Sequence, residues 1–481
     1  MVSSLPNPLR LVLVYIGLAL ARVGLIDDAN VRRTVDLAWP RILTGLARMS
    51  KGAADVAMVG VALGEVAIAG VGFAGPYWGM AFALGGGLAA GTIALVSQRY
   101  SAGAYDELGQ AIRTSGVIVL AVSAPVGALF VLAPTELISV LTDDSRTIRY
   151  GADYLRVLGF GVPFAALNLV GSRALIGADD AWTPMVLRAT GAVANIGLNA
   201  VFIFGLGLGV VGAGLGTALS NALIAAAFAV GLARGRLPLV GDFPISVDPT
   251  GRYFVREFAR DITTIGLPVI GRGSIWTVAR FPMLAFVGLF GPQVVAAYIV
   301  ARRIWGLMNT PGWGFGLATS SLVGQALGQD DEASAAIYGR EISVFSAATY
   351  LLSAVLVVVF AEQIVVLFVD DPASKTVPIA RDFVYVAALA IVPQGIASSL
   401  DGALDATGDT RWPFYGRIVS MFCLAVPFTY LGATTSLGLL GIYLSFFAET
   451  TVPALVNYWR FRSGAWRRIS REYRPDQPSG G

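Results

Sequence analysis

The chain has 481 residues, of which 56% are hydrophobic and only 14% are charged, and its mean hydropathy is +0.70. A soluble protein of this size cannot bury so much apolar side chain, so lipid is the expected solvent for much of the surface. A formal net charge of +3 excludes a strongly basic surface for nucleic acid. With one cysteine and no histidine, the chain also lacks the means for a disulfide framework, Cys/His zinc sites or a histidine base. We therefore expect neither an enzyme nor a cofactor.

Apolar runs long enough to cross a bilayer recur along the chain. The first run, Leu9–Leu25, is short and contains Arg22, so we expect it to form a helix on the membrane surface. A hydrocarbon core of about 30 Å needs roughly 20 helical residues. Twelve later runs meet this length, at 35–63, 67–98, 111–133, 152–177, 183–205, 209–233, 261–290, 294–327, 341–369, 381–404, 413–432 and 438–460. The predicted fold class is therefore an all-α membrane protein with twelve transmembrane helices.

The longest connection between spans lies in the middle of the chain and is rich in proline and glycine, which indicates a boundary between two lobes. Arginine gathers in this connection and in alternate loops, so both termini and the connection are expected to be cytoplasmic. The predicted parts are an N-terminal cytoplasmic or interfacial segment (1–33), an N-lobe (34–233), a cytoplasmic linker (234–260), a C-lobe (261–460) and a cytoplasmic tail (461–481).

The two lobes repeat one pattern. Pro40 and Gly60 of the first half fall on Pro268 and Gly288 of the second half, and Gly209 falls on Gly438, all at a nearly constant offset. Each half has six spans and so enters the membrane from the same side. We therefore expect the six-helix lobes to be related by a pseudo-twofold axis along the membrane normal, with a substrate cleft between them near mid-membrane.

Three groups of residues share their order and spacing with a known family of transporters. They are Pro40 with Ala54-Asp55 and Val59-Gly60, the connection from Ala174-Leu175-Ile176-Gly177 to Thr183-Pro184, and the segment Asn195-Ile196-Gly197-Leu198-Asn199 with Phe204-Gly205. In these features, and over about residues 32–460, the chain resembles the multidrug and toxic compound extrusion (MATE) family. The resemblance implies a secondary antiporter that exports drug-like organic molecules in exchange for Na⁺ or H⁺ by rocking two lobes.

Four polar residues in the first lobe form a candidate coupling site. Asp55 lies within the first span, where an ionisable group costs roughly 2.5–3.5 kcal/mol and so invites a functional interpretation. Asn195 and Asn199 share one helix face, and with Thr217 they offer oxygen ligands suited to a hard cation such as Na⁺. The resemblance implies that Asp55, Asn195 and Thr217 take the ligand positions of the N-lobe ion site, whereas many relatives have a second acid at Asn199. The structural alternatives are an ion pair of Asp55 with Lys51, four residues earlier, and amides that merely bridge helices.

The first span also carries a basic stripe. Its spacing puts Arg41, Arg48 and Lys51 on the same side as Asp55, and their summed insertion cost is too high for lipid contact. We expect Pro40, Arg48 and Lys51 to serve as hinge or cavity residues. For Arg41 the alternative is that its side chain extends to the membrane–water interface on the cytoplasmic side. Such a cavity would favour anions or zwitterions over a purely cationic drug.

The second lobe offers basic residues without evident partners. We expect no buried acid beside Arg272, Arg280 and Arg302, and we expect Asp401 and Asp405 to lie at a solvated loop edge. Coupling is therefore predicted to be confined to the first lobe.

Two functions remain open at this point. The first is a cation-coupled exporter of small amphipathic organic molecules, and the alternative is a lipid-linked saccharide flippase of the same superfamily, which the basic residues Arg48 and Lys51 favour. Either protein would meet membrane lipid and no nucleic acid, and we expect a monomer. Two lysines against 32 arginines indicate a GC-rich genome, and hence the cell membrane of a prokaryote. The sequence leaves the choice between Na⁺ and H⁺ open.

Overall fold

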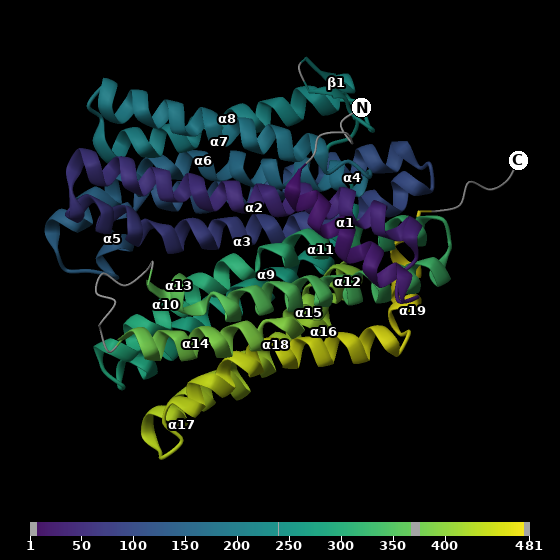
Figure 1. The fold of residues 1–481 in the computed structure, drawn as a ribbon. Coiled ribbons are helices and arrows are strands. Elements are labelled where there is room, and N and C mark those ends of the chain that lie inside the picture. The colour runs from purple at the N-terminus through teal and green to yellow at the C-terminus, as the bar shows by residue number, and fades with distance from the viewer. Residues whose placement is uncertain (1–6, 239, 367–375, 476–481) are drawn as a thin grey trace, which may run out of the picture. The chain divides into compact units, whose positions relative to one another are not determined.

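The computed structural model describes residues 7–238, 240–366 and 376–475, which form long helices and one two-stranded sheet (Figure 1). The elements of the first half are α1 (Pro8–Arg22), α2 (Asp28–Leu63), α3 (Glu65–Ser101), α4 (Tyr105–Leu132), α5 (Pro134–Ser139), α6 (Ser145–Gly177), α7 (Trp182–Ala200), the π-helical turn η1 (Val201–Gly205), α8 (Gly209–Arg234), β1 (Arg236–Leu237) and β2 (Gly241–Asp242). Those of the second half are α9 (Arg256–Gly288), α10 (Pro292–Met308), α11 (Thr310–Gly328), α12 (Glu332–Val359), α13 (Ala361–Val366), α14 (Thr376–Ala390), α15 (Val392–Ala406), α16 (Arg411–Ile418), η2 (Val419–Ala425), α17 (Val426–Thr434), α18 (Leu439–Arg462), α19 (Trp466–Ser470) and the 3₁₀ turn η3 (Arg471–Tyr473).

The helices follow the predicted spans, and the all-α membrane fold class is confirmed. Five predicted spans consist of consecutive helical pieces, namely α7 with η1, α10 with α11, α12 with α13, α14 with α15, and α16 with η2 and α17. In the described part of the chain, eight helices are long and apolar enough to cross a membrane, and α14 and α15 count as a ninth if their 42° bend lies within one span. Residues 367–369, the end of the ninth predicted span, lie outside the described residues, as do the ends of the chain at 1–6 and 476–481.

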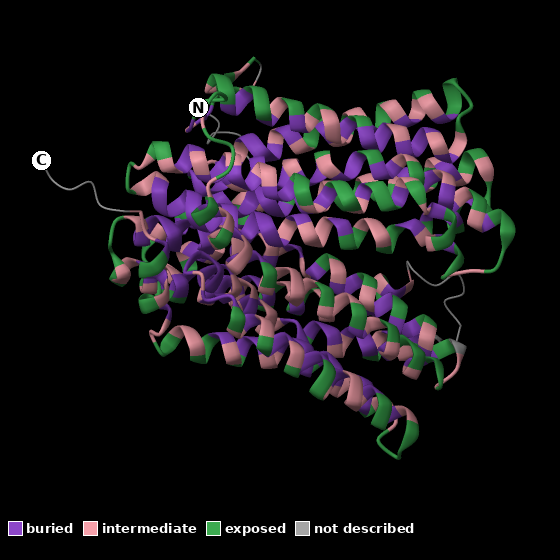
Figure 2. Ribbon diagram, turned by 180° about the vertical axis from the view of Figure 1, so that it is seen from behind, coloured by how far each residue is buried: buried purple, intermediate pink, exposed green. Residues whose placement is uncertain are grey.

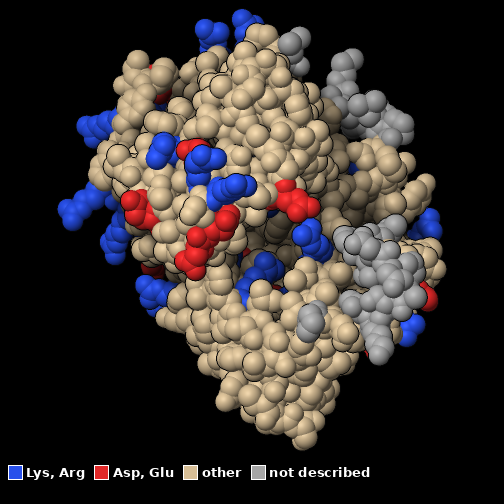
Figure 3. All heavy atoms as spheres, turned by 90° about the vertical axis from the view of Figure 1, so that its left-hand side faces the viewer, with Lys and Arg blue, Asp and Glu red and all other residues tan. Residues whose placement is uncertain are grey.

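The outer faces of the helices suit a lipid environment. On α4, for example, Leu120, Leu129 and Leu132 are exposed while Leu108 and Phe130 are buried. Figure 2 shows buried residues gathered between helices and exposed ones along their outer sides. Figure 3 shows that uncharged atoms cover most of the face it draws. Because water would penalise so many exposed apolar side chains, these surfaces are explained by contact with lipid tails.

Contacts divide the chain into two compact units, one formed by Leu43–Ile270 and the other by Met1–Ile42 with Gly271–Arg474. The chain passes from one unit to the other within α2, after Ile42, and within α9, after Ile270. Each passage comes two residues after a proline, Pro40 in α2 and Pro268 in α9, which are the pair that the repeat superposes. A proline removes one helical hydrogen bond and favours a bend. A hinge role for Pro40 remains a prediction, and the position of the passage supports it.

The linker predicted at 234–260 belongs to the unit formed by Leu43–Ile270. It forms the β1–β2 hairpin and then buries Phe243, Ile245 and Val247 in a cluster with side chains of α4 and α8. Arg113 of α4 donates from Nη1 to the backbone oxygen of Asp248 at 2.6 Å. These contacts join the predicted linker to helices α4 and α8 of this unit.

Close helix packing gives a first test of the fold. A Cβ atom added at Gly402 of α15 would collide with the backbone oxygen of Gly316 in α11. We therefore expect Gly402→Ala to destabilise the protein by about 1–3 kcal/mol, since backbone cannot yield as a flexible side chain does. Gly306→Ala in α10 is the matched control, because no heavy atom lies within 4 Å of its added Cβ. Thermal unfolding in detergent should show a lower Tm for the first variant only, and equal Tm values would contradict this packing.

Candidate ion and substrate site

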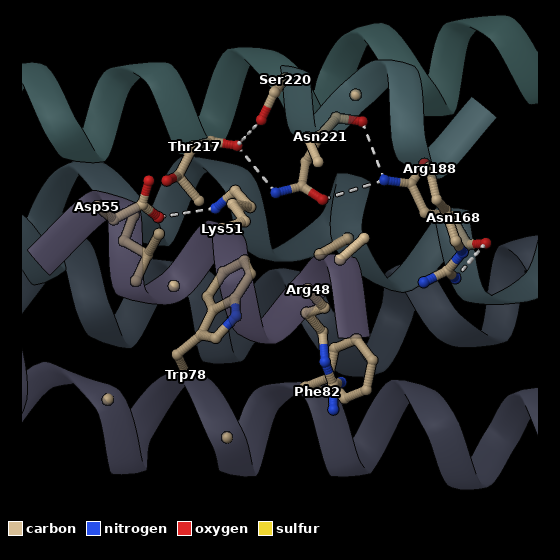
Figure 4. A pocket seen from close by; sticks show the side chains of 18 of the residues that line it. Arg48, Lys51, Asp55, Trp78, Phe82, Asn168, Arg188, Thr217, Ser220 and Asn221 are labelled. Atoms are coloured by element: carbon tan, nitrogen blue, oxygen red, sulfur yellow. Dashed lines mark hydrogen bonds and ion pairs between the residues drawn. The ribbon is translucent and has the colours of Figure 1, made fainter. Parts of the chain in front are cut away.

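A cavity of about 600 Å³ lies within the unit formed by Leu43–Ile270 (Figure 4). Helices α2, α3, α6, α7 and α8 supply its walls, so five helices of one unit converge on it. The polar and aromatic side chains that line it are Thr44, Arg48, Lys51, Asp55, Trp78, Phe82, Tyr154, Asn168, Arg188, Thr217, Ser220 and Asn221. A volume of this size suits a drug-sized molecule.

Asp55 is buried at the wall of this cavity, with 7% of its surface exposed. Its Oδ2 lies 2.9 Å from the ammonium of Lys51, one helical turn earlier. Its Oδ1 accepts a hydrogen bond of 2.8 Å from Nδ2 of Asn199. The carboxylate therefore forms the ion pair that was the structural alternative, and it also contacts the amide of Asn199 in the candidate coupling site.

The other predicted ligands continue this network. Nδ2 of Asn199 lies 3.4 Å from Oδ1 of Asn195, and Nδ2 of Asn195 donates to the Thr217 hydroxyl at 3.1 Å. Both asparagines are fully buried, and within the described chain Oδ1 of Asn199 has no hydrogen-bond partner. The structure thus brings Asp55, Asn195, Asn199 and Thr217 together in one hydrogen-bonded chain. A carboxylate, two amides and a hydroxyl can bind either a proton or a hard cation, the latter after an amide turns its oxygen inward.

Helix α7 positions the two asparagines because its start is capped. Asp180 directly follows a left-handed turn at Asp179 and accepts a hydrogen bond of 2.9 Å from the backbone N–H of Thr183. Burial raises the pKa of this Asp180 carboxyl above its usual value, although the hydrogen bonds from Thr183 oppose that effect. Immediately after Asn199 and Ala200, the chain enters the π-helical turn η1, a local geometry often found beside functional residues.

The opposite end of the cavity is basic. Figure 4 shows Arg188 there with Asn168 and Asn221, far from the pair of Asp55 and Lys51. Nη2 of Arg188 donates to the backbone oxygen of Asn168 at 3.2 Å, and the Asn168 amide donates to Oδ1 of Asn221 at 3.1 Å.

Arg48 and Lys51, two of the predicted hinge or cavity residues, both line this cavity. Pro40 does not line it and belongs to the other unit. Three further lining residues, Arg188, Asn168 and Asn221, were not predicted from the sequence. An arginine within an otherwise apolar span was the available signal.

The second half of the chain holds ion pairs of arginines for which no buried acid was expected. Arg272 contacts Asp401 at 3.1 Å and Asp405 at 2.9 Å, and Arg302 contacts Glu449 at 2.6 Å. The expectation of unpartnered arginines and of a solvated Asp401 and Asp405 was therefore wrong.

The reason for this error is physical. The partners come from spans more than a hundred residues apart, so helical periodicity on one span could not reveal them. Glu449, 1% exposed within the apolar run of α18, was overlooked entirely.

These helices, the apolar outer faces and the polar cavity define an integral membrane transporter. A model of the MatE family matches the chain twice, over residues 40–201 and 268–431. The two matches begin 228 residues apart and confirm the internal repeat. The chain belongs to the MatE family.

The chain is similar to named relatives over nearly all of its length. It is 27% identical over 448 residues to the probable multidrug resistance protein NorM of Bradyrhizobium diazoefficiens, covering 91% of this chain and 94% of the relative. It is 27% identical over 437 residues to the multidrug resistance protein NorM of Vibrio cholerae, covering 88% and 93%. Among solved structures, a MOP superfamily transporter from Pyrococcus furiosus is similar at a TM-score of 0.81 and 24% identity, covering 94% and 98%. The fold of a MATE transporter is thereby established for this chain.

Proposed function

We propose that this protein is a secondary active antiporter that exports small amphipathic organic molecules in exchange for Na⁺ or H⁺, by alternating access of two lobes. The observation that carries the proposal is the buried Asp55 carboxylate, which lines a cavity large enough for substrate and joins a chain of buried amides and a hydroxyl. A group that exchanges an ion in a wall of the substrate cavity can link the two transport events. The names of the multidrug relatives support the same class of substrate.

Asp55, Asn195, Asn199 and Thr217 are the proposed coupling residues. Binding an ion here would compete with Lys51 for the carboxylate and would rearrange the amides of Asn195 and Asn199. Because Asn199 stands where a second acid would add charge, the site holds a single carboxylate. We further propose that the protein acts as a monomer in a prokaryotic cell membrane, with both termini cytoplasmic, as the arginine distribution favours.

Proteoliposomes with separately imposed gradients test this function. A gradient with a higher concentration of Na⁺ or of H⁺ outside right-side-out vesicles is expected to drive efflux of a fluorescent amphipathic molecule such as ethidium or naphthalene-2-sulfonate. One gradient should suffice, and its dissipation should stop the flux. Flux that ignores both gradients would overturn the antiport.

A lipid-linked saccharide flippase is the second candidate, favoured by the three basic side chains Arg48, Lys51 and Arg188 in the cavity. In the same vesicles, a flippase would translocate a polyprenyl diphosphate saccharide and leave both fluorescent probes inside. The gradient assay therefore separates the two candidates.

A further inference from the structure

The charge of the cavity lining is positive. Three cationic side chains, Arg48, Lys51 and Arg188, face it against one anionic side chain, Asp55, which gives a formal net charge of +2. Lys51 forms its ion pair with Asp55 at 2.9 Å, so the remaining excess comes from the two arginines. A cavity with this balance favours an anion over a cation.

The positive charge is also concentrated at one end. Arg48 lies seven residues before Asp55 on α2, a separation of about 10 Å along the helix axis. Arg188 on α7 lies within electrostatic range of the positive charges of Arg173 and Arg48. Like charges held in a partly apolar site repel one another, and a bound anion would relieve that repulsion.

Arg188 has unused hydrogen-bonding capacity. Its Nη2 donates to the Asn168 backbone oxygen, whereas its buried Nε has no hydrogen-bond partner among the described residues. No described carboxylate forms an ion pair with it. Arginine binds carboxylates, sulfonates and phosphates through such donors.

An apolar surface stands beside this basic end. Trp78 and Phe82, one turn apart on α3, both line the cavity, and Figure 4 shows Phe82 beside Arg48. The guanidinium carbon of Arg48 lies 4.9 Å from the centre of the Phe82 ring. Stacking against the ring holds the guanidinium beside an aromatic wall, so one ligand can meet both features.

We propose that the substrates of this cavity are small aromatic organic anions, whose carboxylate or sulfonate binds at Arg188 and Arg48 and whose ring packs on Trp78 and Phe82. The proposal rests on the proposed function for calling the ligand a substrate, but the binding itself needs no ion gradient. The cavity of about 600 Å³ matches a molecule of this size.

Equilibrium binding to the purified full chain in detergent tests the proposal. The probes share one naphthalene ring and differ in charge: naphthalene-2-sulfonate, 2-naphthyltrimethylammonium and the neutral 2-naphthalenemethanol. By isothermal titration, the sulfonate should bind at least about tenfold more tightly than the ammonium, because charge-assisted hydrogen bonds exceed the aromatic contacts that all three share. Equal or tighter binding of the ammonium would overturn the proposal.

Variants locate the binding. Arg188→Gln should weaken sulfonate binding about tenfold or more while leaving the affinity for the neutral probe unchanged, and Arg188→Lys should restore part of the loss. Arg468→Gln, an exposed position on α19, is the matched control and should change nothing. A purely structural role of Arg188 would lower the affinity for all three probes alike, and that result would overturn the proposal.

Two further outcomes distinguish the anion proposal from the flippase alternative and from the proposed antiport. Tighter binding of geranyl pyrophosphate than of the sulfonate would overturn the aromatic anion in favour of a polyprenyl diphosphate. Selective sulfonate binding that depends on Arg188 would sustain this inference even if vesicles showed no coupling to Na⁺ or H⁺, in which case only the antiport would fail.

Discussion

Asp55→Asn is expected to abolish gradient-driven export while leaving membrane insertion and folding intact. Asparagine nearly preserves the volume of the side chain and can still accept the hydrogen bond from Asn199. It removes the carboxylate, however, and no other described residue of the lining carries a negative charge that can bind a proton or a cation. Efflux driven by the coupling gradient should therefore fall to the level of empty vesicles. Tryptophan fluorescence and thermal unfolding of the purified variant would verify that the fold persists.

Loss of transport in Asp55→Asn could come from lost ion coupling or from the lost ion pair with Lys51, and two further variants distinguish these causes. Asp36→Asn on the same helix is the matched control, since Asp36 is a half-exposed partner of Arg10 and lies outside the cavity. The double variant Asp55→Asn/Lys51→Gln removes both members of the pair. If Asp55 only neutralises Lys51, the double variant regains transport; if Asp55 couples the ion, it stays inactive. Recovery in the double variant, or full export by Asp55→Asn alone, would refute the coupling role.

Much of the fold could be predicted from the sequence because a membrane helix requires an apolar run of about 20 residues, which is visible in the sequence itself. Lipid requires continuous apolar runs with every backbone group paired, so the spans could be placed without knowing their neighbours. The breaks inside spans were harder to predict. Helix α10 ends at Met308 and α11 begins at Thr310, directly before Pro311, whereas Pro40 lies inside the continuous helix α2, so a proline alone does not indicate where a span breaks.

The candidate site was predictable where local spacing sufficed. Asn195 and Asn199 lie one turn apart, as do Lys51 and Asp55, and such pairs share a helix face in any fold. The helix that packs against each of these faces is determined by the tertiary structure and not by local spacing. The contacts of Arg188 with Asn168, and of Arg272 with Asp401, cross between helices and therefore could not be read from spacing.

The buried carboxylate of Glu449 provides the largest expected effect on stability. It accepts a hydrogen bond from Trp276, contacts Arg302 at 2.6 Å and lies within electrostatic range of Arg280. Its backbone oxygen also accepts from Arg417 at 3.1 Å. One anion thus balances several cations in the interior of the second half.

Glu449→Gln is therefore expected to destabilise the protein by about 3–5 kcal/mol, since it leaves a buried guanidinium without its counter-charge. Thermal unfolding in detergent should show a markedly lower Tm. Asp382→Asn, which breaks a weak and largely exposed contact of 4.0 Å with Arg381, is the matched control and should have almost no effect.

A second substitution shows whether charge or packing causes the loss at Glu449. Adding Arg302→Met to Glu449→Gln removes the stranded cation and keeps most of the apolar stem, so part of the stability should return. Arg302 also stacks near Phe446, with its guanidinium carbon 4.3 Å from the ring centre, and methionine can retain some of that contact. Additive losses in the double variant would instead show that the carboxylate stabilises the helices by its shape and hydrogen bonds, independently of the charge on Arg302.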